Sequence, residues 1–294
     1  MMCSARSVLL ALLLLPIGAP VLLACASTGA GSPPRLDAQG RVIPPASQTG
    51  RVGRADSAQR PPQVSEADFR QARVHHSLGL ANLQEGRVAL AIRELRAAAK
   101  LNPYDPWIRL ALAESYRLKG FFSDAEAELQ SALDDAPGFQ NARLTLSALY
   151  IQMERYEDAI QQAALLIQDP TFPDPWTALT NQGYAQMKLG RHQEARRSLE
   201  LALDYEPSYW RATLNLGILE AEQGRRLEAL RRFEEVLEAE TGPMVRAEVN
   251  YRMAQIYLAL GEREQAVAHL AATRATSPKG PWGKRSEDTL RRLR

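Results

Sequence analysis

Small and apolar residues recur at regular intervals along residues 72–280. A small residue opens each copy of the pattern, a glycine follows seven residues later, and an alanine follows five residues after the glycine. Successive copies are 34 residues apart except where short insertions follow the third and fifth copies. These three positions are held, copy by copy, by Gly79, Gly86 and Ala91; Ala113, Gly120 and Ala125; Ser147, Glu154 and Ala159; Gly183, Gly190 and Ala195; Gly217, Gly224 and Ala229; and Ala254, Gly261 and Ala266.

The spacing predicts a pair of antiparallel helices in each copy. Small residues at the first and third positions let two helices approach closely, and the glycine between them ends the first helix in a left-handed conformation. In four copies a proline twelve residues after the alanine marks the start of the next copy. The third copy departs from this pattern, because Glu154 replaces the glycine and the proline is absent. Its following segment, 169–176, is expected to be a rigid loop, and 286–294 a capping helix that shields the last pair.

The repeated residues resemble the tetratricopeptide repeat over roughly residues 72–280. The resemblance implies an all-α fold, a right-handed α-solenoid of six tetratricopeptide repeats with a C-terminal capping helix. The composition agrees, since only 6% of the residues are aromatic and good helix formers dominate the middle and end of the chain.

The N-terminus has the features of a secretory signal peptide. Arg6 precedes the apolar run 8–15, which Pro16 interrupts well before the roughly 20 apolar residues that a spanning helix needs. The sequence Leu22-Leu23-Ala24-Cys25 then resembles the bacterial lipobox, which implies a covalent lipid on Cys25. The residues after the cysteine are not the aspartate that retains such lipoproteins at the inner membrane, so the resemblance implies the outer membrane. The alternative is an ordinary signal peptide with a chance cysteine.

We therefore expect three segments: a lipoprotein signal peptide at 1–24, a lipidated cysteine with a Pro/Gly-rich disordered tether at 25–67, and the six-repeat domain with its capping helix at 68–294. The tether lacks aromatic residues and cannot bury enough apolar surface to offset its ordering entropy. The net charge of +2 gives no broad cationic field, so nucleic acid is not expected as a partner.

No catalytic or metal-binding pattern is present. The histidines are His75, His76, His192 and His269, and they lie in different repeats except for the adjacent pair, whose side chains point to different faces of a helix. Glycine-rich phosphate loops and the HExxH and GxSxG motifs are also absent from the sequence. We therefore expect neither an enzyme nor a metal site, and no cofactor beyond the lipid on Cys25.

In a solenoid of helix pairs, the first helix of each pair lines the concave surface. Here the positions that face this groove are mostly apolar, with charged rim residues such as Arg73, Arg211 and Glu222. An apolar patch of this kind indicates a binding site for an amphipathic helix or an apolar extended segment. The alternative for some of these side chains is packing between neighbouring repeats. The expected partner-binding residues are Leu80, Leu83, Trp107, Leu110, Leu118, Leu144, Ile151, Tyr184, Met187, Leu214, Ile218, Tyr251 and Leu258.

A lipobox, a tether and six such repeats together resemble the pilotin lipoproteins of type IV pili, the PilF, PilW and Tgl group. The likeness is strongest over 156–228 and includes Pro173-Asp174-Pro175-Trp176, Asn181-Gln182-Gly183 and Pro207-Ser208-Tyr209. It implies that the chain binds secretin subunits and promotes their localisation and multimerisation in the outer membrane. Two alternatives stay open: a periplasmic scaffold that organises cell-wall enzymes, and an assembly factor for another envelope machine.

Overall fold

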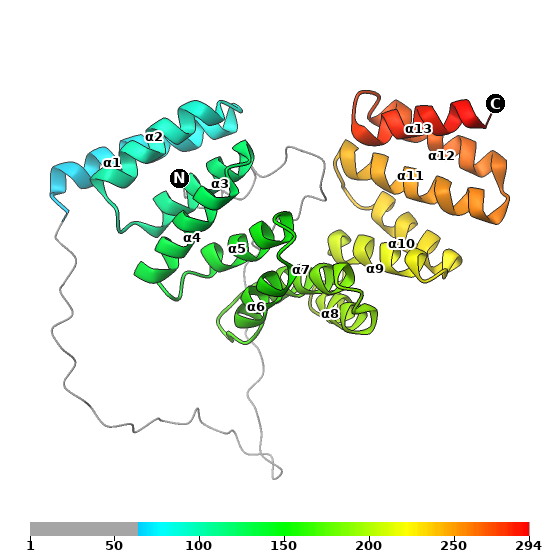
Figure 1. Cartoon of the computed structure of the whole chain (residues 1–294), viewed down its shortest axis with the longest axis horizontal. Helices are drawn as coiled ribbons and strands as arrows, with labels where there is room; N and C mark the ends of the chain where they lie inside the picture. The colour runs from blue at the N-terminus through cyan, green and yellow to red at the C-terminus, as the bar shows by residue number, and fades with distance from the viewer. Residues whose placement is uncertain (1–63, 294) are drawn as a thin grey trace, which may run out of the picture. The chain divides into compact units, whose positions relative to one another are not determined.

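The computed structural model describes residues 64–293, and this part of the chain contains thirteen α-helices and no strand (Figure 1). The all-α class and the six consecutive helix pairs expected from the repeats are confirmed. The predicted signal peptide, the lipobox with Cys25 and the tether up to residue 63 lie outside the described residues. The helices are α1 (Glu66–Gln84), α2 (Val88–Leu101), α3 (Pro106–Lys119), α4 (Phe122–Asp135), α5 (Gln140–Gln152), α6 (Tyr156–Ile167), α7 (Pro175–Lys188), α8 (His192–Tyr205), α9 (Trp210–Glu222), α10 (Arg226–Glu238), α11 (Pro243–Leu260), α12 (Arg263–Thr276) and α13 (Pro281–Arg292).

The described residues divide into two compact units. Unit 1 comprises residues 64–143 and the loop 169–173, and unit 2 comprises residues 144–168 and 174–293, so that α5 contributes to both. Within unit 1, α1 to α4 pack against one another in chain order, and α1 also contacts α3. Within unit 2, α6 to α13 pack in chain order, with further contacts of α7 with α9 and of α11 with α13. The odd-numbered helices α1 to α11 are the first helices of their pairs, and the even-numbered helices α2 to α12 are the second.

Close approach of the two helices in a pair explains the small residues. A Cβ atom on Gly183 would lie 2.7 Å from Cγ of Leu199, and one on Gly217 would lie 2.7 Å from Cε1 of Phe233. In the third copy the small residue is Ser147, and its Oγ donates a hydrogen bond to the carbonyl oxygen of Ala159 on the second helix at 3.0 Å. The alanines of the pattern are fully buried in all six pairs. Each second helix therefore packs directly onto the backbone of its first helix.

The turn within each pair requires a left-handed residue. The five glycines at this position have φ between 72° and 82°, as the sequence pattern predicts. Glu154 adopts the same conformation, with φ of 58°, and among the described residues it is the one non-glycine with positive φ. Packing of the helix pair thus imposes the turn even where the sequence offers no glycine.

Glu154→Gly is expected to stabilise the protein, because a left-handed residue with a Cβ atom costs roughly 1–2 kcal/mol relative to glycine, offset in part by the greater freedom of glycine in the unfolded chain. The matched control is Gly120→Ala, where the left-handed backbone is present and a Cβ would meet nothing within 4 Å. Urea unfolding followed by circular dichroism should move the midpoint up for the first variant and down for the second. A lower midpoint for Glu154→Gly would show that the glutamate side chain contributes more than its backbone costs.

The two insertions differ in structure. After the third pair, the loop 169–173 is held in unit 1 by Gln140, whose Nε2 donates to Oδ2 of Asp169 at 2.8 Å and to Oγ1 of Thr171 at 3.0 Å. These bonds, from Gln140 first and then Thr171, lower the pKa of Asp169. After the fifth pair, the extra residues are helical, and they lengthen α11 to 18 residues.

The first helix and the capping helix both begin earlier along the chain than the sequence predicts. Helix α1 starts at Glu66, ahead of the expected boundary at 68, because the Ser65 side chain caps it by accepting from the backbone N–H of Asp68 at 3.1 Å. The capping helix starts at Pro281 instead of Ser286, since proline suits the first turn of a helix. Its Ser286 is buried, and the Oγ donates to the carbonyl oxygen of Leu270 at 2.6 Å, which fixes α13 on the last pair. No helix in the described range is long and apolar enough to span a bilayer.

Candidate partner-binding site

All thirteen residues expected to bind a partner lie on first helices: α1, α3, α5, α7, α9 and α11. Five belong to unit 1 and eight to unit 2. Six of them keep partial exposure and are therefore able to contact a partner directly. These are Leu80, Trp107 and Leu118 in unit 1, and Leu144, Tyr251 and Leu258 in unit 2.

The other seven expected residues are buried, which is a larger share than the pattern suggested. They are Leu83, Leu110, Ile151, Tyr184, Met187, Leu214 and Ile218. Met187, Leu214 and Ile218 belong to the main hydrophobic core of unit 2, together with Leu199, Phe233 and their neighbours. These side chains fill the space between adjacent repeats, which is the alternative to partner binding that the sequence left open. A charge at any of the seven is expected to cost stability in addition to any effect on binding.

In unit 1, aromatic and apolar side chains dominate the candidate surface. Trp107 packs edge-to-face against Phe139, with the ring centroids 4.9 Å apart. Phe69 was not among the expected residues, yet it is 41% exposed near the start of α1. It stands eleven residues before Leu80, so the two side chains lie on the same side of the helix at 3.6 residues per turn. The sequence signal for Phe69 was its position eleven residues before Leu80, on the same apolar side of the helix. Phe69 was missed because it precedes the first recognisable repeat.

In unit 2, the corresponding surface is more polar than the sequence pattern suggested. Lys188 lies over the ring of Tyr184, with Nζ 5.2 Å from the centroid. Burial, followed by the nearby Tyr156 and Glu248, raises the pKa of Tyr184, so its hydroxyl stays neutral. On α11, Arg252 donates to Oε1 of Glu248 through Nε at 3.0 Å and Nη2 at 2.7 Å. Lys188 and this ion pair place charged groups beside the apolar ones.

Three buried polar residues of unit 2 correct the expected picture of a charged rim around an apolar centre. Arg211 was expected at the rim but is only 7% exposed, and Asn215, one turn further along α9, is only 4% exposed. Asn181 on α7 is buried to the same degree. Sequence reasoning placed Arg211 outside because charged residues are seldom buried. The signal that it missed was the preceding pair Tyr209-Trp210, whose rings lie beneath the guanidinium with centroids 5.9 and 4.4 Å from its Cζ.

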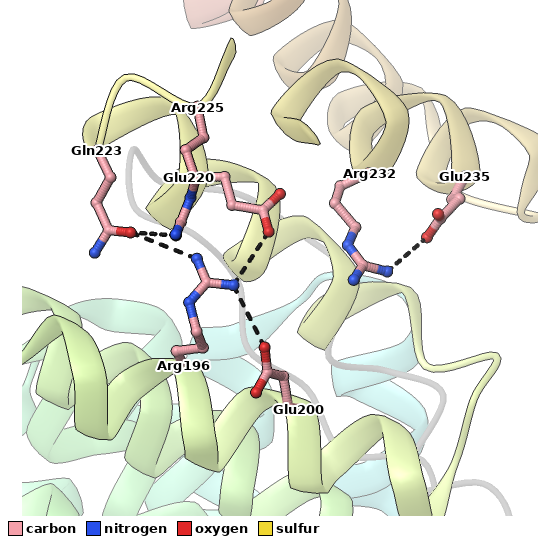
Figure 2. Close-up of polar contacts among 7 residues, drawn as sticks. All are labelled: Arg196, Glu200, Glu220, Gln223, Arg225, Arg232 and Glu235. Atoms are coloured by element: carbon pink, nitrogen blue, oxygen red, sulfur yellow. Dashed lines mark hydrogen bonds and ion pairs between the residues drawn. The ribbon is translucent and has the colours of Figure 1, made fainter. Parts of the chain in front are cut away.

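A polar network joins α8 to α9 (Figure 2). Arg196 on α8 reaches Glu220 and Gln223 with nitrogen–oxygen distances of 3.3 and 3.4 Å, and it also contacts Glu200 on its own helix. Gln223 accepts a further hydrogen bond from Arg225. The Glu220 side chain is only 6% exposed. The network links the fourth and fifth repeats, which is a structural role.

The described residues contain no group of three or more histidine, cysteine or carboxylate side chains placed to hold a metal ion. Two histidines are instead part of the packing. Nε2 of His76 is buried without a hydrogen-bond partner. His269 stacks on Tyr257 at 5.3 Å between ring centroids, and its Nδ1 lies 2.9 Å from Oδ1 of Asn250. Burial lowers the pKa of both histidines, an effect that Asp105 opposes at His76 and Glu234 at His269.

These two pKa shifts predict that acid destabilises the protein. In the unfolded chain histidines have a pKa of about 6.5, whereas in the folded protein the pKa of His76 and of His269 is lower. The unfolded state therefore binds more protons, so the free energy of unfolding is constant above about pH 6.5 and decreases as the pH falls below it. The urea midpoint should therefore decrease between pH 7.5 and 5.5. His76→Gln with His269→Gln should flatten this dependence, and an unchanged slope in that variant would assign the acid sensitivity to other groups.

The helix pairs, with partly apolar first-helix surfaces, define a helical-repeat protein of the kind that binds other proteins. Models of the tetratricopeptide repeat match residues 72–115, 118–181, 180–240 and 220–282, more than half of the chain together. The chain belongs to the tetratricopeptide-repeat family. A search of curated protein sequences finds no match.

Several solved structures are similar in fold. The structure reported for the functional characterisation of Pseudomonas aeruginosa PilF aligns over 76% of this chain and 100% of its own, with a TM-score of 0.61 and 17% identity. PilW, described as a widely conserved type IV pilus biogenesis factor, aligns over 72% of this chain and 96% of its own, with a TM-score of 0.63 and 20% identity. A tetratricopeptide-repeat protein from Parabacteroides merdae aligns over 73% and 82%, with a TM-score of 0.63 and 19% identity. At these identities the likeness concerns the fold alone.

Proposed function

We propose that this protein is a non-enzymatic adaptor lipoprotein that acts as a pilotin. In this role it is anchored to the outer membrane through a lipid on Cys25, faces the periplasm, binds secretin subunits and promotes their multimerisation for type IV pilus assembly. The observation that carries the proposal is the near-complete alignment of PilF and PilW on the repeats of this chain, at 100% and 96% of their lengths. The lipobox and the insertion after the third repeat support it independently.

A second function is a periplasmic scaffold that organises cell-wall enzymes or another envelope assembly machine. The Parabacteroides merdae tetratricopeptide-repeat protein is as similar in fold as PilW, at a TM-score of 0.63, so the fold alone does not select a pilus role. Both functions use the first-helix surface to bind a protein. They differ in the partner and in what its loss does to the cell.

The pilotin function predicts that deleting the gene abolishes the heat-resistant secretin multimer in outer membranes, with secretin monomer accumulating. Expression of the wild-type chain should restore the multimer. Outer-membrane fractions separated on denaturing gels without boiling provide the measurement. A normal multimer in the deletion strain would end the pilotin proposal and leave the scaffold function standing.

Cys25→Ser expressed in the same strain tests the anchor. Each buried CH₂ of an acyl chain adds about 0.8 kcal/mol of membrane affinity, so several chains on one cysteine hold a protein firmly without a spanning helix. The variant is expected to move from the membrane to the soluble periplasmic fraction while keeping the circular dichroism spectrum of the folded domain. Continued sedimentation with outer membranes after a salt wash would mean that another feature attaches the protein.

A further inference from the structure

Positive charge gathers at the C-terminal end of unit 2. Residues 274–292 contain six basic and two acidic residues, a net charge of +4. Because the whole chain carries +2, all the other residues together carry −2. The local excess belongs to α13 and to the end of α12 that leads into it. The six cations are Arg274, Lys279, Lys284, Arg285, Arg291 and Arg292.

Five of these six cations are exposed and have no carboxylate partner in the described range. The sixth, Arg291, contacts Glu287 at 2.6 Å and Asp288 at 4.0 Å, and so it takes up both acidic residues of the segment. The guanidinium of Arg285 lies over the ring of Trp282, with Cζ 4.9 Å from the centroid. This contact orients the guanidinium but does not neutralise its charge.

The cations of α13 lie on the side of the helix that faces away from the repeats. Ser286 is buried and donates to a carbonyl oxygen of α12, so its side of α13 faces the last helix pair. At 3.6 residues per turn, Lys284, Arg285 and Arg292 fall within an arc of about 100° on the other side. Asp288 lies in the same arc and reduces the net charge of this face by one.

Helix stability does not account for all of these cations. The negative end of the helix dipole favours cations in the last turn, which explains the basic residues in the last turns of α12 and α13. Lys279, Lys284 and Arg285 lie instead just before and near the start of α13, where the dipole disfavours cations. The first turn of α13 also contains no acidic residue. Three exposed cations that stability does not explain point to an anion outside the chain.

We propose that Lys279, Lys284, Arg285 and Arg292 form a basic surface that docks on the anionic headgroups of the membrane to which the protein is anchored. The proposal rests on the proposed lipid anchor, which keeps the domain near a bilayer. Exposed cations spread along one helix face suit a broad negative surface, whereas recognition of a single anion needs converging donors. The attraction acts within a screening length of about 8 Å at physiological ionic strength, so docking turns α13 toward the bilayer.

Flotation with lipid vesicles tests the basic surface. The chain from residue 25 with Cys25→Ser is purified, so that no acyl chain contributes to binding. It is mixed with vesicles of phosphatidylcholine alone, or of phosphatidylcholine and phosphatidylglycerol in equal parts. The protein should float with the anionic vesicles only. Salt at about 1 M, where the screening length is about 3 Å, should release it.

The combined replacement of Lys279, Lys284 and Arg285 by glutamine should weaken binding to the anionic vesicles roughly a hundredfold, because each cation near an anionic bilayer adds to the affinity. Arg292 is kept, since it also stabilises the end of the helix. All three replaced side chains are exposed, so the circular dichroism melting curve should stay that of the parent chain.

The matched control removes the same number of exposed cations from other helices and should bind the anionic vesicles like the parent chain. It combines Lys100→Gln on α2, Lys119→Gln on α3 and Arg231→Gln on α10. An equal loss of binding in this control would assign the effect to net charge and overturn the basic surface. Absence of flotation with anionic vesicles would overturn it as well.

Two soluble anions separate the membrane from other sources of negative charge. A polyglutamate peptide that binds the chain when anionic vesicles do not would assign the surface to an acidic protein segment, against the proposal. Displacement from vesicles by free glycerol 3-phosphate would assign it to a small soluble anion, with the same consequence.

Flotation requires neither secretin nor the lipid on Cys25, so its result is independent of the pilotin function. Vesicle binding by a protein whose deletion leaves the secretin multimer normal would keep the basic surface and reject the pilotin function. Loss of the multimer in the deletion strain, without vesicle binding, would do the reverse.

Discussion

Replacement of Ala195 by leucine is expected to destabilise unit 2 by about 1–3 kcal/mol, the usual cost of overpacking a tight interior. Ala195 is fully buried on α8, and its carbonyl oxygen would lie 3.2 Å from a Cβ placed on Gly183 of α7. The two helix backbones are therefore too close for three extra carbon atoms. Accommodation requires α8 to move away from α7, which also separates Leu199 from the glycine beneath it.

Thermal and urea unfolding, followed by circular dichroism at 222 nm, measure the effect. The matched control is Gln193→Leu, which adds a leucine to the same helix at an exposed position and should leave the midpoint nearly unchanged. A wild-type midpoint for Ala195→Leu would contradict the close contact of α7 and α8. The same result would also question the repeat register of the fourth copy, since that register assigns Ala195 to the interface.

The fold was predictable because its determinants are local and repeated. A glycine or alanine that must lie against a neighbouring helix recurs with the period of the helix pair, so Gly183 and Ala195 identify both the helices and their contact. Glu154 shows the limit of that reading. Its conformation follows from the packing of the pair and not from its own preference, which is why the turn persists without a glycine.

The binding surface was less predictable, because burial depends on neighbours that a single helix does not reveal. Spacing placed every expected residue on a first helix, but it could not separate Leu258, which keeps partial exposure, from Ile218, which the next repeat covers. Arg211 was misplaced for the same reason. Its stacking on the adjacent Trp210 accompanies this burial, but the aromatic pair in the sequence does not show which side of α9 the neighbouring helices cover.

Leu118→Glu in unit 1 and Leu258→Glu in unit 2, made singly and together, are expected to abolish partner binding. Both leucines keep partial exposure on first helices, so a glutamate at either position stays hydrated in the free protein and the fold persists. A bound apolar segment would strip water from the carboxylate, and an unpaired buried charge costs several kcal/mol. At about 1.4 kcal/mol per tenfold, each change should weaken binding at least a hundredfold.

The controls for this prediction are Leu227→Glu on α10 and Leu165→Glu on α6, which make the same change at leucines 67% and 49% exposed on second helices. In cells, the pilotin function requires that the first-helix variants lose the heat-resistant secretin multimer, while the second-helix variants keep it. Binding of purified secretin subunits, measured by calorimetry, should give the same order. Loss of the multimer only in the second-helix variants would move the binding surface to the other side of the repeats. Equal loss in all four single variants, with normal melting temperatures, would mean that the partner covers both sides, because the chemistry of the substitution is the same at every position.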